Sequence, residues 1–158
     1  MANDIYSLDV RDLGGEPATL NQFSGKVTLL VNVASYCGKT PQYAGLERLQ
    51  QRYASKGFSV LAFPSNDFGK QEPGTPDEIR EFCDSNYRIT FPLFEKVQTK
   101  AGAEQSKVYS ALEADTGKLP AWNFAKYLIG RDGKAVRFFS HNVEPESPEV
   151  VSAIESLL

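Results

Sequence analysis

The fold is decided by the stretch Val27-Thr28-Leu29-Leu30-Val31-Asn32-Val33-Ala34-Ser35-Tyr36-Cys37-Gly38-Lys39-Thr40-Pro41. Its apolar run from Val27 to Val33, broken only by Thr28 and Asn32, predicts a buried strand. Thr40-Pro41 then predicts a helix start, with a hydroxyl N-cap followed by proline at the first helical position. Cys37 therefore lies in the turn between the end of a strand and the N-terminus of a helix.

This position gives Cys37 a possible chemical role. Backbone N–H groups and the positive end of a helix dipole stabilise an anion there, and the thiolate is the nucleophilic form of cysteine. Gly38 lets a substrate approach the backbone closely. We therefore hypothesise a redox or nucleophilic cysteine. The alternative is a buried, inert cysteine, because free cysteine is among the most buried residue types.

Size and composition limit the classes of protein to consider. With 158 residues the chain is expected to form a single domain over residues 1–158. Its 17 basic and 20 acidic residues are well mixed, so nucleic acid is not an expected partner. No apolar segment approaches about 18 residues and no secretory signal is evident, so we expect no integral membrane contact and a cytoplasmic location. Two cysteines and one histidine favour neither a structural disulfide nor a zinc site, and no cofactor is expected.

The remaining pattern predicts a hairpin within residues 5–23, followed by alternating helices and strands. The expected elements are helix 41–53, strand 58–63, loop 64–74, helix 75–87, helix 106–114, strands 127–129 and 135–139, and a last helix from Ser147-Pro148. A βαβ unit followed by an antiparallel pair and a terminal helix indicates an α/β protein with a mixed central sheet and helices on both faces. The thioredoxin fold has this layout, with its reactive cysteine at the strand-to-helix turn.

Three uncharged side chains could assist chemistry at Cys37. Peroxide reduction needs neutral hydrogen-bond donors near the sulfur, because the leaving oxygen develops negative charge. Gln71 follows the second core strand, and the carboxyl ends of parallel strands share one edge of a sheet. Trp122-Asn123 precedes a later strand and supplies an indole N–H and an amide. Taken singly, the tryptophan is more often a core residue and the glutamine a solvated one.

The motifs as a set resemble those of the glutathione peroxidase family, over essentially the whole chain. The matching stretches are Asn32-Val33-Ala34-Ser35 with Cys37-Gly38 and Thr40-Pro41-Gln42-Tyr43, Leu61-Ala62-Phe63-Pro64 with Asn66, Phe68-Gly69 and Gln71-Glu72-Pro73-Gly74, and Trp122-Asn123-Phe124 with Lys126-Tyr127-Leu128. The resemblance implies a thioredoxin-like fold, a peroxidase activity, and a catalytic set formed by Cys37, Gln71, Trp122 and Asn123.

The resemblance also gives Cys83 a role. Phe82-Cys83 with Asn86-Tyr87 is similar to the segment that carries the resolving cysteine in thioredoxin-dependent, two-cysteine members. A disulfide needs Cα atoms within about 7 Å, and the spacing of Cys83 places it on the inner face of a helix. We therefore expect that helix to unwind partly before a Cys37–Cys83 bridge forms. A buried helix cysteine is the alternative.

Several residues depart from the family pattern. Ser65 stands where many thiol members have a further cysteine, and Asp67 stands where glutamine is usual and would bring a carboxylate near the site. The stretch 114–122 is short, so the loop associated with tetramers is expected to be missing. This predicts a monomer with an open site that admits bulky or lipid hydroperoxides.

The implied reaction is an antioxidant cycle on a hydroperoxide substrate. Cys37 becomes a sulfenic acid, Cys83 converts it to a redox-active disulfide, and thioredoxin reduces that disulfide. Glutathione is the less favoured reductant, because no basic cluster can be placed around the site. A peroxide sensor that passes oxidation to a partner protein through the same disulfide remains an alternative. A thioredoxin-type reductase is disfavoured because Thr40 interrupts Cys-x-x-Cys, and a peroxiredoxin because Leu30 and Ala34 replace its proline and threonine.

Overall fold

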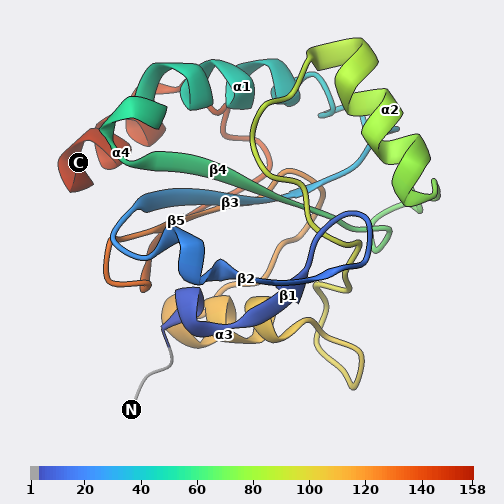
Figure 1. Ribbon diagram of the computed structural model, residues 1–158, viewed down its shortest axis with the longest axis horizontal. Coiled ribbons are helices and arrows are strands. Elements are labelled where there is room, and N and C mark those ends of the chain that lie inside the picture. The colour runs from blue at the N-terminus through green and yellow to red at the C-terminus, as the bar shows by residue number, and fades with distance from the viewer. Residues whose placement is uncertain (1–3) are drawn as a thin grey trace.

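A four-stranded sheet runs through the centre of the molecule (Figure 1). The computed structural model describes residues 4–158. The strands lie in the order β4 (Phe58–Pro64), β3 (Val27–Val33), β5 (Lys126–Ile129) and β6 (Ala135–Phe139). β3 and β4 are parallel, while β5 pairs antiparallel with both β3 and β6. The sheet is therefore mixed, as the order of elements predicted.

Helices cover both faces of this sheet (Figure 1). α1 (Gln42–Tyr53) and α4 (Pro148–Leu157) lie on one face, and α3 (Lys107–Thr116) lies on the other. α2 (Pro76–Tyr87) stands beside the N-terminal end of α1. Its capping box at Thr75 is formed as the sequence predicted.

An N-terminal hairpin covers part of the α3 face. β1 (Asp9–Arg11) pairs antiparallel with β2 (Pro17–Thr19), so the hairpin expected within residues 5–23 is confirmed. Three short 3-10 helices complete the elements of residues 4–158: Ile5–Ser7, Leu20–Phe23 and Ala54–Lys56.

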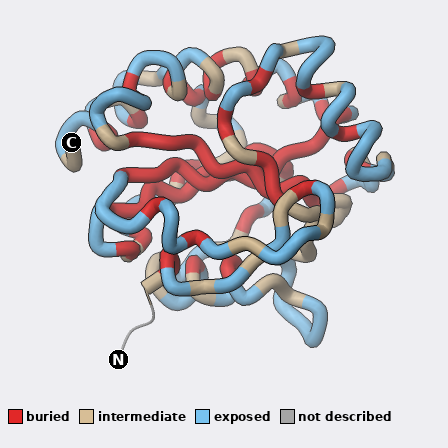
Figure 2. Tube along the Cα trace, in the orientation of Figure 1, coloured by how far each residue is buried: buried red, intermediate tan, exposed pale blue. Residues whose placement is uncertain are grey.

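The two faces of the sheet form two hydrophobic cores because successive side chains of a strand point to opposite sides. Leu29, Val31 and Val33 pack with α1, α2 and α4, whereas Leu30 packs with α3 and the hairpin. Every residue of β3 and β4 is buried, and Figure 2 shows the buried residues concentrated along the strands. Burial on both sides explains why these strands appear in the sequence as continuous apolar runs.

One expected cap is wrong. Thr40 does not cap α1, whose N-cap residue is Pro41 in helical conformation with no capping side chain. The Thr40 hydroxyl is used inside the preceding turn, where it accepts from the Cys37 N–H and donates to the Ala34 carbonyl. Residues 38–41 form tight turns, so the regular helix begins only at Gln42.

Lys126 is a charged residue at a fully buried position of β5. Its side-chain amino group donates to the carbonyls of Phe124, Val143 and Ser140, and thereby ties the end of β5 to the loop that leads to α4. Burial lowers the pKa of Lys126 from 10.5 to about 7, with Glu144 opposing the shift and Lys39 adding to it.

The variant Lys126→Met should lose a pH dependence of stability that the wild-type protein has. Between pH 7 and 9 the unfolded chain binds a proton at Lys126 that the folded chain does not, so the free energy of unfolding of the wild type rises with pH. Relative to the variant, the wild type should gain up to about 1.4 kcal/mol per pH unit in this range. Urea unfolding at pH 6, 7, 8 and 9 measures the difference, and parallel profiles for the two proteins would contradict it.

Candidate active site

Cys37 lies in a hydrogen-bonded turn directly after β3. Its exposed fraction is 7%, and it is a free thiol. The backbone N–H of Lys39 donates to Sγ at 3.2 Å, and the Cys37 N–H donates to Thr40 Oγ1 at 2.9 Å. A backbone donor is therefore aimed at the Cys37 sulfur.

Gln71, Trp122 and Asn123 meet in a second cluster built from two loops. Asn123 is fully buried, and its amide donates to Gln71 Oε1 at 3.0 Å and to the Phe68 carbonyl at 3.3 Å. The Trp122 ring packs against the Phe68 ring at a centroid distance of 5.8 Å. Because the Gln71 oxygen is occupied by Asn123, its amide N–H₂ is left to donate to another group.

Backbone hydrogen bonds join this cluster to the cysteine turn. The N–H of Tyr36, which precedes Cys37, donates to the Gln71 carbonyl at 3.0 Å. Asn32 of β3 holds the other loop, because its amide donates to the Trp122 carbonyl and accepts from the Ala125 N–H, both at 3.0 Å. The three neutral side chains are thus fixed to the strand and turn that carry the cysteine.

The structure brings Gln71, Trp122 and Asn123 together in one cluster. Within residues 4–158, the one hydrogen bond to Cys37 Sγ comes from the Lys39 backbone and none comes from those three side chains. Their action on the sulfur therefore stays a prediction. The carboxylate of Asp67, expected near the site, is instead occupied by the Thr99 N–H and hydroxyl and the Lys100 N–H.

Two residues that support the site were not singled out from the sequence. Asn32 is one, and its signal was a polar residue inside an otherwise apolar strand. Gly69 is the other: its φ is +66°, and a Cβ there would lie 3.0 Å from the Trp122 ring and 3.3 Å from the Gln71 side chain. Only glycine fits this approach without displacing the two side chains.

Cys83 is fully buried in the middle of α2, and it too is a free thiol. Burial raises the pKa of Cys83 from 9.0 to about 11, while the neighbouring Tyr43 hydroxyl opposes the shift. The residues beside the two cysteines touch, since the rings of Tyr36 and Phe82 lie 6.2 Å apart. α2 therefore packs against the turn that carries Cys37. The thiol of Cys83, within α2, is protonated and shielded from solvent.

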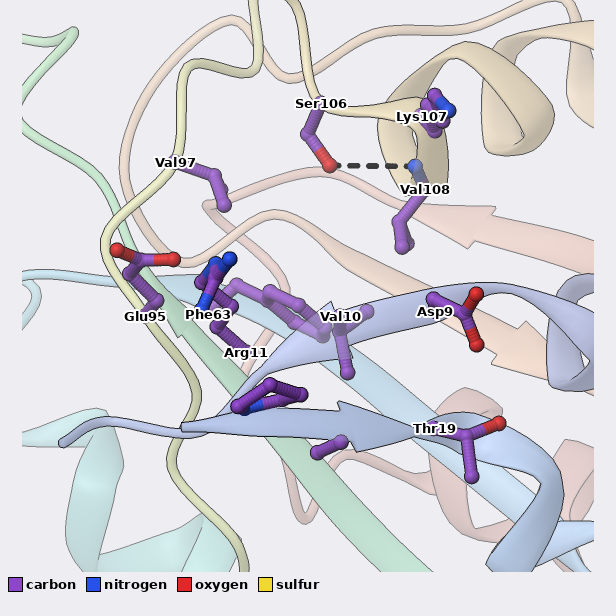
Figure 3. A pocket seen from close by; sticks show the side chains of 12 residues that line it. Asp9, Val10, Arg11, Thr19, Phe63, Glu95, Val97, Ser106, Lys107 and Val108 are labelled. Carbon is purple, nitrogen blue, oxygen red and sulfur yellow. Dashed lines mark hydrogen bonds between the residues drawn. The ribbon is translucent and has the colours of Figure 1, made fainter. Parts of the chain in front are cut away.

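A separate pocket of about 690 Å³ lies on the other side of the molecule, between the hairpin and α3 (Figure 3). Figure 3 shows Val10, Arg11 and Phe63 among its lining residues, together with Ser106, whose hydroxyl accepts from the Val108 N–H. None of the predicted site residues lines it, so it is distinct from the cysteine site.

Residues 4–158 contain no group of three or more His, Cys, Asp or Glu side chains placed to hold a metal ion. In the same part of the chain, every helix is too short or too polar to cross a bilayer.

A mixed sheet with a free cysteine at the strand-to-helix turn defines a thiol oxidoreductase of thioredoxin-like fold. Solved structures agree: one titled Trgpx in apo form aligns with a TM-score of 0.79 and 32% identity, covering 99% of this chain and 96% of that one. A second, T. cruzi GPX1, gives a TM-score of 0.75 at 28% identity, with 98% and 96% covered.

The sequence comparisons identify the family. The family model described as glutathione peroxidase matches residues 5–113. The chain is 44% identical to glutathione peroxidase-like peroxiredoxin 2 of Saccharomyces cerevisiae, covering 100% of this chain and 99% of that protein. It is 42% identical to hydroperoxy fatty acid reductase gpx1 of Synechocystis (99% and 96% covered) and 38% identical to thioredoxin/glutathione peroxidase BtuE of Escherichia coli (100% and 99% covered).

The chain belongs to the glutathione peroxidase family, and the resemblance noted from its motifs is confirmed. It is a peroxidase, an enzyme of the oxidoreductase class.

The variant Gly69→Ala should lose activity through displacement of Trp122 and Gln71. We expect kcat/KM for a hydroperoxide to fall at least about tenfold, since small misplacements of positioning groups have effects of up to about a hundredfold. Alanine is also strained in the left-handed backbone conformation of position 69, which should lower the free energy of unfolding by about 1–3 kcal/mol. Peroxide consumption assays and urea unfolding measure both.

Gly14→Ala is the matched control, because a Cβ there meets only Asp12 Oδ1 at an ordinary 3.5 Å. An activity loss in the control equal to that of Gly69→Ala would contradict the assignment.

Proposed function

We propose that Cys37 attacks the terminal oxygen of a hydroperoxide as a thiolate. The O–O bond breaks, the Cys37 sulfur is oxidised to a sulfenic acid, and the released alkoxide or hydroxide leaves as an alcohol or water after taking up a proton. The observation that carries this proposal is the free Cys37 thiol with the Lys39 N–H donating to its sulfur at the end of β3.

Gln71, Trp122 and Asn123 are proposed to stabilise the negative charge that develops on the departing oxygen. The support is their mutual geometry: Asn123 fixes the Gln71 oxygen and so leaves the Gln71 N–H₂ available as a donor. Uncharged donors suit this task because they cannot repel or protonate the thiolate as a carboxylate or carboxylic acid would. The buried Asn123 Oδ1, which has no partner within residues 4–158, adds an acceptor for a peroxide O–H.

Cys83 is proposed to resolve the sulfenic acid as a Cys37–Cys83 disulfide, which thioredoxin then reduces in preference to glutathione. The contact between Tyr36 and Phe82 supports the pairing, since it joins the chain segments next to the two cysteines. The burial of Cys83 within α2 supports partial unwinding of the helix during this step. The relative named thioredoxin/glutathione peroxidase supports the reductant.

Organic and lipid hydroperoxides are the proposed substrates, alongside hydrogen peroxide. A relative is named a hydroperoxy fatty acid reductase, and the side chain of Tyr36 is 65% exposed next to the reactive cysteine, where it offers an apolar surface to an acyl chain. The short connection between α3 and β5, residues 117–125, supports an open site on a monomeric single domain. We further propose a cytoplasmic role in the response to oxidative stress, since free thiols persist in a reducing compartment.

Substitution of the two cysteines separates the steps of this cycle. Cys37→Ser should reduce peroxide consumption to the uncatalysed rate, because the remaining thiol, Cys83, is buried and protonated. Cys83→Ser should consume one equivalent of peroxide per chain and then stop, because the sulfenic acid cannot be resolved. Peroxide assays with thioredoxin or glutathione as sole reductant, followed by mass analysis for a Cys37–Cys83 link, measure these outcomes.

Sustained thioredoxin-dependent turnover by Cys83→Ser would rule out the resolving role. Slow turnover of the wild type together with rapid transfer of oxidation to a protein target would instead support the peroxide sensor.

A further inference from the structure

The loop after β4 is held in place by an aspartate that the proposed reaction does not use. Oδ2 of Asp67 accepts three hydrogen bonds: from the Thr99 N–H, from the Thr99 hydroxyl at 2.8 Å and from the Lys100 N–H at 3.4 Å. Hydrogen bonds to a carboxylate are roughly twice as strong as those between neutral groups. A bond from the Glu72 N–H to Asn66 Oδ1 closes the loop on itself, whereas Asp67 fastens it to the segment that precedes α3.

The segment to which Asp67 binds is itself fixed. Thr99 is fully buried, so its N–H and hydroxyl would be left without an acceptor if the carboxylate were removed. The Thr99 carbonyl accepts from the Gln105 side chain at 3.0 Å. The Gln98 carbonyl accepts at 2.9 Å from the N–H of Ser106, which is the N-cap residue of α3. Asp67 thus holds the loop against a part of the chain that is anchored to a helix.

The residue after Asp67 packs against two of the side chains proposed to act in the reaction. The Phe68 ring contacts the Trp122 ring, and the Phe68 carbonyl accepts from the Asn123 amide. The Lys100 ammonium lies 5.0 Å from the centre of the Phe68 ring, within range of a cation–π interaction. The two segments therefore make contact through two successive residues, which restrains the orientation of Phe68 as well as the position of its backbone.

The backbone between Asp67 and Gln71 is strained. Gly69 and Lys70 both have left-handed conformations, with φ of +66° and +52°. A lysine keeps this conformation only where its surroundings enforce it. The carbonyl of Gln71 is held by the Tyr36 N–H at one end, and the carboxylate of Asp67 is the anchor at the other. Loss of that anchor would let Lys70 return to a right-handed conformation and would move the Gln71 side chain.

We propose that Asp67 is a positioning residue for the reduction of the peroxide. By fastening the loop, its carboxylate keeps Gln71, Trp122 and Asn123 in the arrangement that stabilises the departing oxygen. The inference rests on the proposed function, because it assumes that stabilising role. Asp67 acts through these side chains and takes no part in the chemistry itself.

Two reactions of the reduced protein separate positioning from other effects. Reduction of hydrogen peroxide in a single turnover needs the Cys37 thiol and the groups that stabilise the departing oxygen, whereas alkylation of Cys37 by iodoacetamide needs only the thiol. Mass analysis of acid-quenched samples gives both second-order rate constants. The fluorescence of Trp122, the only tryptophan of the chain, reports the surroundings of its ring.

Asp67→Ala should lower the rate constant for hydrogen peroxide at least about tenfold, because small displacements of positioning groups are costly. Its rate constant for alkylation should stay within about twofold of the wild type, since the thiol is unchanged, and its Trp122 emission should shift. Asp67→Asn, which keeps an oxygen acceptor for Thr99, should recover most of the loss.

Thr99→Val, which removes one donor and keeps the carboxylate, should show a smaller loss of the same kind, and it serves if Asp67→Ala does not fold. Asp9→Ala is the matched control. It removes an exposed carboxylate of β1 that lines the pocket on the other side of the molecule, and it should behave as the wild type.

An Asp67→Ala protein that reduces peroxide at the wild-type rate, or that loses alkylation as much as peroxide reduction, would overturn the role of Asp67. Gln71→Ala tests the proposed function separately, because it removes the N–H₂ donor itself. Peroxide reduction at the wild-type rate by Gln71→Ala would overturn the stabilising role of the cluster, and this inference with it. A slow Gln71→Ala beside a fast Asp67→Ala would overturn the inference alone.

Discussion

The hydrogen bonds of Asn32 hold together the two chain segments on which the site depends. Its amide and its backbone carbonyl engage Trp122, Phe124 and Ala125, at distances between 2.7 and 3.0 Å. Phe124 has a φ of +70°, a conformation that a non-glycine residue keeps only where its surroundings enforce it. Because Asn32 is fully buried, loss of these partners would leave polar atoms without water, so the bend before β5 is energetically coupled to β3.

Aromatic contacts hold α2, the helix that carries Cys83, against α1. Tyr43 of α1 contacts Phe82 and Tyr87 of α2 as well as Phe91 and Phe124, with ring centroids 5.3 to 6.5 Å apart. The same contacts that keep α2 folded in the reduced protein must be given up for the proposed disulfide. A more stable α2 would therefore slow formation of the proposed Cys37–Cys83 disulfide. α2 has only 12 residues, and a helix this short can open locally without unfolding of the whole domain.

The sequence predicted most of the fold because the decisive signals are local. The apolar run of β3, the capping box of α2 and the Asp-Gly turn before β6 each specify an element within a few residues. One local prediction was wrong: the Thr40 hydroxyl does not cap α1 but forms hydrogen bonds within the preceding turn. The partners of Asn32 lie some ninety residues further along the chain, and no local pattern encodes such a contact.

The exposure of Tyr36 has a consequence for how enzymes of this kind can diversify. Its backbone N–H is bonded to Gln71 whatever side chain follows, while its ring stands largely in solvent. At position 36 the main chain therefore helps to hold the turn that carries Cys37, whereas the side chain faces solvent beside it. Under the function proposed above, exchange of this one residue would change the surface that an oxidant meets and leave the backbone hydrogen bond to Gln71 in place.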